Sequence, residues 1–186
     1  MSRGVSADPQ ITVGVVIALP EPVHSELAAM RHRAGDPQAA SVPPHVTLLP
    51  PTAISAAALP EVEEHLARVA EKFPPFWMHL SGPGTFRPVS QVVFVQVAAG
   101  LSACEQIEAA VRSGPLWSEA PFPYHPHATV AHDVPAAALD AAYDALRGYD
   151  VTFPVAGFTM FEQDAAGVWQ PQRQFTLDGA QDVGHT

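Results

Sequence analysis

The 186-residue sequence has little that could cross-link it or hold it in a membrane. It contains one cysteine, Cys104, so no disulfide can form within the chain, as is usual in a reducing compartment. The apolar run at residues 11–19 is too short to span a bilayer and lacks the cleavage site of a signal peptide. We therefore predict a cytoplasmic monomer with no membrane partner, and we expect Cys104 to be packed in the core.

Positive charge is also scarce. Nine basic residues, among them the single lysine Lys72, are outnumbered by 19 acidic residues, and the formal net charge is −10. Proteins that bind long nucleic acids neutralise many phosphates with Lys and Arg, so this balance argues against a long duplex as the partner. A nucleotide or a short RNA end is compatible with it, because such a ligand needs only a local site.

Apolar residues make up 47% of the sequence, which favours a globular fold, and the 20 prolines mostly separate apolar runs. Periodicity and β-branched residues predict where strands and helices lie. The predicted strands cover residues 11–19, 45–49, 76–80, 91–98, 127–132, 150–155, 158–163 and 168–177, and the predicted helices cover 21–33, 55–73, 101–113 and 135–147. Pro50-Pro51 is expected to end the second strand, and residues 81–84 are expected to form a loop.

The order of these elements repeats along the chain. The first strand and helix begin near residues 11 and 21, and a second strand and helix begin about 80 residues later, near 91 and 101. A strand, a helix and a further strand follow in each half. A repeat of this length predicts one domain over residues 1–186, built of two pseudo-symmetric lobes in the α+β class.

Two short segments stand at matching places in the repeat. PPHVTLLPP contains His45 and Thr47, and YHPHATVAH contains His127 and Thr129. Side chains alternate faces along a strand, so the histidine and threonine of each segment share one face and apolar neighbours occupy the other. A single His-x-Thr is common, but two at matching places are not expected by accident. If a two-fold axis relates the lobes, the two pairs can meet across one cleft.

Two such pairs suit the cleavage of a phosphodiester. Imidazoles titrate near neutrality, so one histidine can accept a proton from an attacking water or hydroxyl while the other donates a proton to the leaving oxygen. The hydroxyls of Thr47 and Thr129 can donate hydrogen bonds to the non-bridging oxygens, where negative charge must be stabilised. This chemistry needs no metal. Pseudo-symmetry leaves open which histidine is the acid and which is the base.

These motifs resemble the hallmark of the 2H phosphoesterase superfamily, which includes the 2′-5′ RNA ligase-like proteins. The resemblance covers roughly residues 11–177. It implies a bilobal fold of two antiparallel β-sheets flanked by outer helices, with the active site in a central cleft. It also implies a cyclic phosphodiesterase that opens the 2′,3′-cyclic phosphate of a nucleotide or RNA end without a cofactor, with His45, Thr47, His127 and Thr129 as its catalytic residues.

Four more residues are candidates for substrate contact. Arg87 could reach a phosphate, and the rings of Phe86 and Tyr124 could stack on a nucleobase, although surface and packing roles are the ordinary alternatives. His132 stands five residues after His127, where many RNA-acting relatives of the resembled family carry arginine. Strand alternation predicts that His132 points away from His127 unless the strand bends, and together with the missing arginine this argues against a strong grip on an oligonucleotide through that residue.

Two other classes of function stay open. The acidic composition and the missing arginine are compatible with a non-catalytic module that binds a nucleotide or phosphate. His125, His127, His132 and Asp133 could instead be read as the zinc ligands of a metallohydrolase. Their spacing matches no recognised zinc pattern, and the zinc interpretation leaves the copy of the motif at His45 unexplained.

Overall fold

The computed structural model describes residues 8–180, so both ends of the predicted domain lie outside the described residues. Within them the strands are β1 (Gln10–Ala18), β2 (His45–Ser55), β3 (Phe76–Thr85), β4 (Val92–Ala99), β5 (His127–His132), β6 (Asp150–Val155), β7 (Gly157–Gln163) and β8 (Trp169–Thr176). The helices are α1 (Val23–Ala34), α2 (Leu59–Ala70), α3 (Leu101–Val111) and α4 (Ala136–Ala145), with short 3₁₀ turns at Ala56–Ala58 and Gly114–Leu116.

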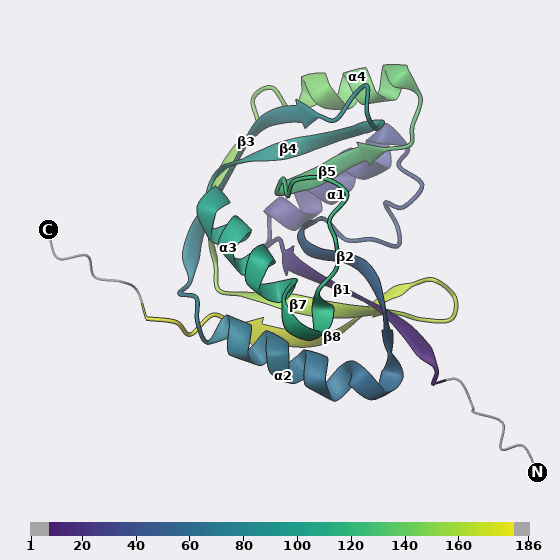
Figure 1. Cartoon of the computed structure of the whole chain (residues 1–186). Coiled ribbons are helices and arrows are strands. Elements are labelled where there is room, and N and C mark those ends of the chain that lie inside the picture. The colour runs from purple at the N-terminus through teal and green to yellow at the C-terminus, as the bar shows by residue number, and fades with distance from the viewer. Residues whose placement is uncertain (1–7, 181–186) are drawn as a thin grey trace, which may run out of the picture.

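The strands of the described chain form one curled antiparallel sheet in the order β6-β3-β4-β5-β2-β1-β7-β8 (Figure 1). We call β2, β1, β7 and β8 the first lobe, and β5, β4, β3 and β6 the second lobe. The lobes meet where β2 and β5 pair, with Val46 opposite Ala128. The predicted α+β fold of antiparallel strands with outer helices is confirmed, and the sheets expected for the two lobes are joined through this pair.

Two helices cover each lobe (Figure 1). Helices α1 and α4 pack against each other and against β5, whereas α2 and α3 pack against each other, with α3 also against β2 and α2 against β8. Each lobe therefore takes one helix from each half of the chain. The covered side of the sheet is apolar: Val13, Val15 and Ile17 of β1 and Val93 and Val95 of β4 are at most 2% exposed. They belong to one continuous core and leave alternate residues for the opposite face.

Strand β2 is longer than predicted. The pair Pro50 and Pro51, expected to end it, forms a bulge opposite Gly14 of β1, and the strand continues to Ser55. A bulge accommodates proline because the ladder does not require the missing N–H there. The prediction that the prolines end the strand was therefore wrong.

Strand β3 is also longer than predicted. Residues 81–84, expected to form a loop, continue the strand to Thr85. The pairing with β4 shifts between Leu80 and Pro83, and Gly82 has a φ of 69°. Glycine adopts this left-handed conformation without steric cost, which permits an extra residue in the strand instead of a turn.

The repeat in chain order is only partly a repeat in space. Strands β1 and β4, and β2 and β5, occupy matching positions in the two lobes. The last strand of each half, β3 and β6, pair with each other in the second lobe, and β7 and β8 complete the first. We infer that the two lobes form a single domain, because the chain passes between them repeatedly.

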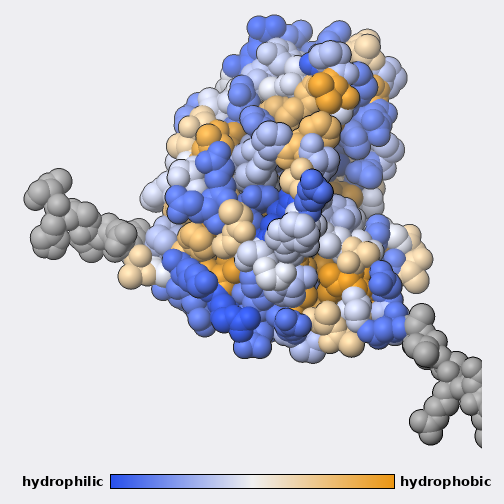
Figure 2. Space-filling view, viewed as in Figure 1, coloured by the Kyte–Doolittle hydropathy of each residue, from blue (hydrophilic) through white to orange (hydrophobic). Residues whose placement is uncertain are grey.

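The surface and the single cysteine agree with a packed globular structure. On the face seen in Figure 2, hydrophobic residues form small patches separated by hydrophilic ones. No helix among residues 8–180 is long and apolar enough to cross a membrane. Cys104 is fully buried, and its burial raises the pKa of the thiol to about 12, so the expectation of a packed thiol is confirmed.

Candidate active site

The two His-x-Thr segments lie side by side at the junction of the lobes. Val46 and Ala128, the middle residues of the segments, form the pair that joins β2 to β5. Continuing this antiparallel register by one residue in each direction places His45 beside Thr129, and Thr47 beside His127. Diagonal neighbours in an antiparallel pair are roughly 7–8 Å apart, a spacing that leaves room for a phosphate between the two imidazoles.

Both segments contain a bulge at the same position. Thr129 lies opposite Phe94 and Ala131 opposite Val93, so Val130 is an extra residue in β5. In β2, Leu48 is extra in the same way, because Thr47 and Leu49 lie opposite consecutive residues of β1. Each bulge buries two successive apolar residues on the core side and keeps the histidine and threonine on the other.

The bulge in β5 also changes the direction of His132. In β4, Gln96, Phe94 and Val92 alternate regularly and share one face, and their partners are His127, Thr129 and His132. His132 therefore lies on the face of the two catalytic candidates. His132 would point away from His127 on a regular strand, but the strand bends here, because alternation does not hold across a bulge. Its Nε2 lies 3.4 Å from Oδ2 of Asp133, and its side chain is 39% exposed.

Each imidazole is held by the backbone just before it. Nδ1 of His45 lies 2.7 Å from the carbonyl oxygen of Pro43, and Nδ1 of His127 lies 2.7 Å from that of His125. A carbonyl oxygen can only accept, so Nδ1 carries the proton in both rings and donates it. This contact leaves Nε2 as the titrating atom of each neutral ring, and neither Nε2 bonds to any residue in 8–180.

Burial lowers the pKa of both imidazoles. Desolvation is the largest cause for each, and the hydrogen bond to the backbone opposes it. The positive charges of Arg31 and of protonated His127 further lower the pKa of His45, and that of protonated His125 further lowers the pKa of His127. The two rings are therefore biased toward the neutral form, and an anion bound between them would favour protonation.

The threonines and Tyr124 play different parts. The hydroxyls of Thr47 and Thr129 make no hydrogen bond to residues 8–180, so both are available to a ligand. Tyr124, predicted to stack on a base, donates its hydroxyl to the carbonyl oxygen of Thr47 at 2.8 Å and packs against the core. Burial raises the pKa of its phenol. In this arrangement Tyr124 fixes the backbone of β2 beside the site.

Phe86 lies directly against His127. The ring centroids are 4.9 Å apart with the planes at 90°, and Phe94 lies 5.0 Å from the same imidazole. Phe86 and Phe94 also contact each other at 4.5 Å. The two phenyl rings restrict the rotation of the imidazole and exclude water from one side of it.

Arg87 turns toward a carboxylate. Its Nη1 donates to Oδ1 of Asp140 at 2.7 Å, and its Nε donates to the hydroxyl of Thr85 at 3.3 Å. The side chain is only 27% exposed. Binding a phosphate through Arg87 would therefore require the guanidinium to leave Asp140 or to share its donors.

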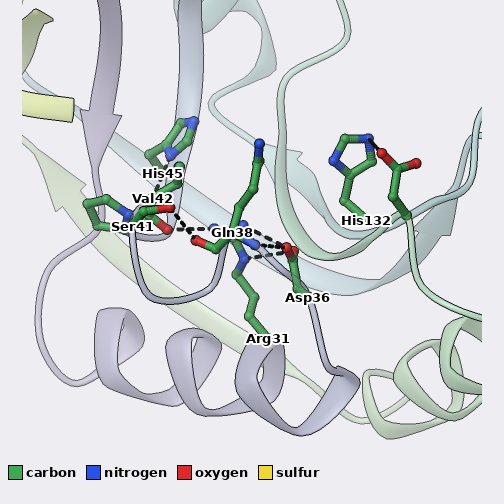
Figure 3. A network of polar contacts seen from close by, with 9 residues as sticks. Arg31, Asp36, Gln38, Ser41, Val42, His45 and His132 are labelled. Atoms are coloured by element: carbon green, nitrogen blue, oxygen red, sulfur yellow. Dashed lines mark hydrogen bonds and ion pairs between the residues drawn. The ribbon is translucent and has the colours of Figure 1, made fainter. Parts of the chain in front are cut away.

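A buried ion pair supports the loop before His45, a feature that the sequence analysis missed. Arg31 of α1 is 3% exposed and donates to Oδ2 of Asp36 through Nε and Nη2, at 3.1 and 3.0 Å. Its Nη1 donates to the carbonyl oxygen of Val42 at 2.7 Å, and Asp36 accepts from the backbone N–H of Gln38. Figure 3 shows this network beneath His45. An Arg and an Asp five residues apart gave no recognisable signal.

The sequence profile of the 2'-5' RNA ligase superfamily matches residues 19–167, a span that includes both histidine segments and the strands that carry them. The chain belongs to the 2′-5′ RNA ligase superfamily. The resemblance drawn from the two motifs is thereby confirmed.

Similar proteins and structures align with this superfamily member over nearly its whole length. The Geobacillus kaustophilus protein named "Putative phosphoesterase GK0864" is 27% identical over 172 residues, which is 91% of this chain and 98% of that protein. Among solved structures, apo LigT of E. coli has a TM-score of 0.66 at 22% identity, covering 91% of this chain and 98% of its own. TT0787 of Thermus thermophilus has a TM-score of 0.62 at 25% identity, covering 91% and 100%. The likeness to these two structures establishes a shared fold.

In this member of the 2′-5′ RNA ligase superfamily, a pocket of about 390 Å³ adjoins His45 of the candidate active site. Its floor is the first lobe's sheet, with Thr47 on β2, Val16 on β1 and Phe161 on β7, and Trp169 of β8 forms one wall. The residues that line it are Gly14, Val16, Ala18, His24, Gln38, Val42, Pro43, Pro44, His45, Thr47, Leu49, Pro50, Pro51, Phe161 and Trp169. Neither Phe161 nor Trp169 is recognisable from the sequence, because only the pairings of β7 with β1 and of β8 with β7 bring them to His45.

Within residues 8–180, no three or more His, Cys, Asp or Glu side chains converge as a metal site would require. The segment from His125 to Asp133, considered for zinc, thus does not assemble a ligand set. His125 stacks beside His127 at 6.2 Å between ring centroids, and His132 pairs with Asp133.

Proposed function

We propose that this phosphoesterase-family protein opens a cyclic phosphodiester, the 2′,3′-cyclic phosphate of a nucleotide or a short RNA end. One observation carries the proposal. Two identically held imidazoles lie diagonally across the Val46–Ala128 pair, each with a threonine hydroxyl beside it, and neither their Nε2 atoms nor these hydroxyls bond to any of residues 8–180. This is the arrangement that an in-line displacement at phosphorus needs.

The reaction follows from these positions. The phosphate lies between the histidines, and Thr47 and Thr129 donate to its non-bridging oxygens. One imidazole removes a proton from water as the water oxygen bonds to phosphorus. The bond from phosphorus to a ribose oxygen then breaks, and that oxygen takes a proton from the other imidazole. The product is a phosphomonoester, and the two histidines have exchanged protonation states.

The charges around the site favour a small substrate. Among residues 8–180, six arginines pair with carboxylates, including the buried Arg31 and the Arg87 that was considered for phosphate binding. These arginines therefore do not form a row of unpaired positive charges that could bind along a duplex. E. coli LigT, which shares the fold, has been solved with 3'-AMP and with phosphate, and these are ligands of the size proposed here.

The test is hydrolysis of the four nucleoside 2′,3′-cyclic phosphates and of short RNAs with cyclic-phosphate ends, in the presence of EDTA. The His45→Ala/His127→Ala protein is the control for contaminating activity. We expect wild-type protein alone to release 2′- or 3′-monophosphates. The absence of turnover on every substrate would contradict the proposal. Affinity for a nucleotide with no product would then favour the binding module.

Zinc dependence is tested in the same assay. Activity that disappears with EDTA and returns with added zinc would contradict the two-histidine mechanism. We expect equal rates with and without the chelator, because each catalytic step is assigned to a side chain of this protein.

A further inference from the structure

The loop that leads from α1 to His45 is folded around the side chain of Arg31. Arg31 and Asp36 are 3% and 5% exposed. Two nitrogens of the guanidinium, Nε and Nη2, donate to Asp36, and the third, Nη1, donates to the carbonyl oxygen of Val42. Asp36 also accepts the backbone N–H of Gln38 through Oδ1. The ion pair therefore joins the end of α1 to the beginning and to the end of this loop.

Stability alone does not account for a buried ion pair at this place. Removing two charges from water is costly, and a pair of apolar side chains of similar volume is often as stable or more stable. An apolar side chain could not, however, donate the hydrogen bond of 2.7 Å from Nη1 of Arg31 to the carbonyl oxygen of Val42. The property that the arginine adds is the geometry of the loop.

A short and rigid segment connects Val42 to His45. Only Pro43 and Pro44 stand between them, and each proline ring fixes its own φ at about −65°. Few dihedral angles are therefore free between the carbonyl that Arg31 holds and the carbonyl of Pro43, which accepts Nδ1–H of His45 at 2.7 Å. Figure 3 shows the contacts of Arg31 leading to Val42 and toward His45. Fixing the carbonyl of Val42 thus fixes the acceptor that orients the imidazole.

The segment before His127 is anchored in another way. Tyr124, three residues before His127, packs against the core. An arginine also reaches the loop before β5, but this residue, Arg112 of α3, donates to the carbonyl oxygen of Ser118, nine residues before His127. The orientation of His45 should therefore depend on an ion pair, and that of His127 should not.

We propose that Arg31, together with Asp36, is a positioning residue for His45: it holds the loop so that the carbonyl of Pro43 keeps the proton on Nδ1 and leaves Nε2 for proton transfer. The proposal rests on the proposed function for the role of His45 in that transfer. Arg31 acts through His45 and exchanges no proton with the substrate.

The tautomer of His45 in the ligand-free protein tests the positioning directly. Nitrogen-15 NMR of the ring nitrogens distinguishes Nδ1–H from Nε2–H at a pH where the rings are neutral. Arg31→Met/Asp36→Leu replaces the ion pair by apolar side chains and should still fold. We expect the Nε2–H form of His45 to appear in this variant, because the acceptor for Nδ1–H is no longer held, whereas His127 should stay in the Nδ1–H form.

Steady-state kinetics on a 2′,3′-cyclic nucleotide measures the consequence for catalysis. In Arg31→Met/Asp36→Leu, kcat should fall roughly 10- to 100-fold with KM nearly unchanged, because the orientation of His45 is lost and no substrate contact is removed. Arg31→Lys keeps the charge but lacks the planar fork that reaches Asp36 and Val42 together. It should change the tautomer and kcat in the same direction, and it replaces the double variant if that protein does not fold.

The matched control removes a partly buried ion pair on α3. Arg112→Met/Glu108→Leu takes away an arginine that pairs with a carboxylate and also donates to a loop carbonyl, that of Ser118. Circular dichroism establishes that each protein is folded. The control should keep both tautomers and full kcat. Equal losses in the control and in Arg31→Met/Asp36→Leu would overturn the proposal, because they would reflect a general loosening of the protein.

The two measurements separate this inference from the proposed function. If the Arg31 variants are folded and keep the Nδ1–H form of His45, the inference is overturned, whether kcat is unchanged or falls by another route. Hydrolysis by the wild-type protein would then still support the proposed function. If the Nε2–H form appears in these variants but the wild-type protein hydrolyses no cyclic phosphate, Arg31 positions His45 and the proposed function fails.

Discussion

The two lobes present the same His-x-Thr pair in different surroundings. In both, a histidine donates Nδ1–H to the carbonyl oxygen two residues earlier, and a bulge follows the threonine. Beside His127, Phe94 fills the space against the sheet, and its ring lies over Gly84 of β3, where an added Cβ would come within 2.3 Å of it. Beside Thr47, the matching residue is Val16, and the space is left open.

This difference shows how a duplicated fold can keep one local geometry in two different surroundings. The orientation of each imidazole is set by a backbone contact close to its motif, and this contact is the same in both lobes. The surroundings are set by neighbouring strands, and they differ. The second lobe packs phenyl rings against its imidazole, whereas the first lobe combines an open pocket with a buried ion pair behind its loop.

Replacing either histidine should have the largest effect. His45→Ala and His127→Ala should each reduce kcat roughly 10²- to 10⁴-fold, because each removes one of two proton transfers. The double variant should be far less impaired than the product of the two losses, since the residues act as a unit. Steady-state kinetics on a 2′,3′-cyclic nucleotide measures all three.

His32 is an exposed histidine on α1. The His32→Ala variant controls for the loss of a histidine outside the site and should retain full activity. Circular dichroism and thermal melting establish that each variant is folded. Unchanged turnover in either active-site variant would show that the two lobes are not catalytic partners.

The ion pair behind the loop that leads to His45 should matter most for stability. Asp36→Ala leaves the guanidinium of Arg31 buried without its partner, and we expect a loss of about 3–5 kcal/mol in the free energy of unfolding. The loop leading to His45 should loosen, whereas the surroundings of His127 should change little. Urea unfolding measures the loss, and proteolysis of the loop locates it.

The matched control removes a carboxylate from an exposed pair. Glu64→Ala breaks the contact of Glu64 with Arg68 on α2, where both side chains are at least 52% exposed, and should cost about 0.3–0.5 kcal/mol. Equal losses in Asp36→Ala and Glu64→Ala would show that burial does not strengthen the ion pair that supports the loop before His45.

The pH dependence of the rate tests whether the pKa of each of the two imidazoles is lowered. Catalysis needs one neutral and one protonated ring. Because both pKa values lie below the ordinary 6.5, this mixed form of the free protein is most abundant below pH 6.5 and declines as the pH rises. We expect kcat/KM to reach its maximum on that acidic side, and kcat to peak at higher pH because bound phosphate favours the protonated rings.

The same shifts affect folding. With folded pKa values below the unfolded value, the unfolded chain binds protons first, so stability is full above pH 6.5 and falls as the pH drops below it. Rates must therefore be compared with circular dichroism at each pH. A maximum of kcat/KM well above neutrality would contradict the lowered pKa values.

Local pattern was enough to predict much of this arrangement. Alternation put His45 with Thr47, and His127 with Thr129, and the spacing of the elements indicated two lobes. The bulges were missed, although the adjacent apolar pairs Leu48-Leu49 and Val130-Ala131 broke the alternation and could have signalled them. The direction of His132 depended on one of these bulges.

The pocket and the ion pair could not be predicted in this way. Trp169 lies more than a hundred residues from His45 in the chain, and it reaches the pocket only because β7 pairs with β1 and β8 with β7. Such pairings depend on how the whole sheet is ordered, which local periodicity does not specify. Arg31 and Asp36 have ordinary surface-residue types, so their burial is a property of the tertiary fold.

Removing the hydroxyl of Tyr124 should have the smallest effect of these changes. It still tests whether Tyr124 fixes β2 of the first lobe or stacks on the base of the substrate. Tyr124→Phe keeps the ring in the core but removes the hydrogen bond to the carbonyl oxygen of Thr47, which should cost about 0.5–1.5 kcal/mol of stability. If the bond fixes β2, kcat should fall a few-fold while KM for the nucleotide changes little. If Tyr124 instead stacks on the base, the phenyl ring would preserve the contact and both parameters would stay at their wild-type values. Tyr124→Leu then separates the two roles, because only a stacking role predicts a large rise in KM when the ring is lost from a protein that still folds.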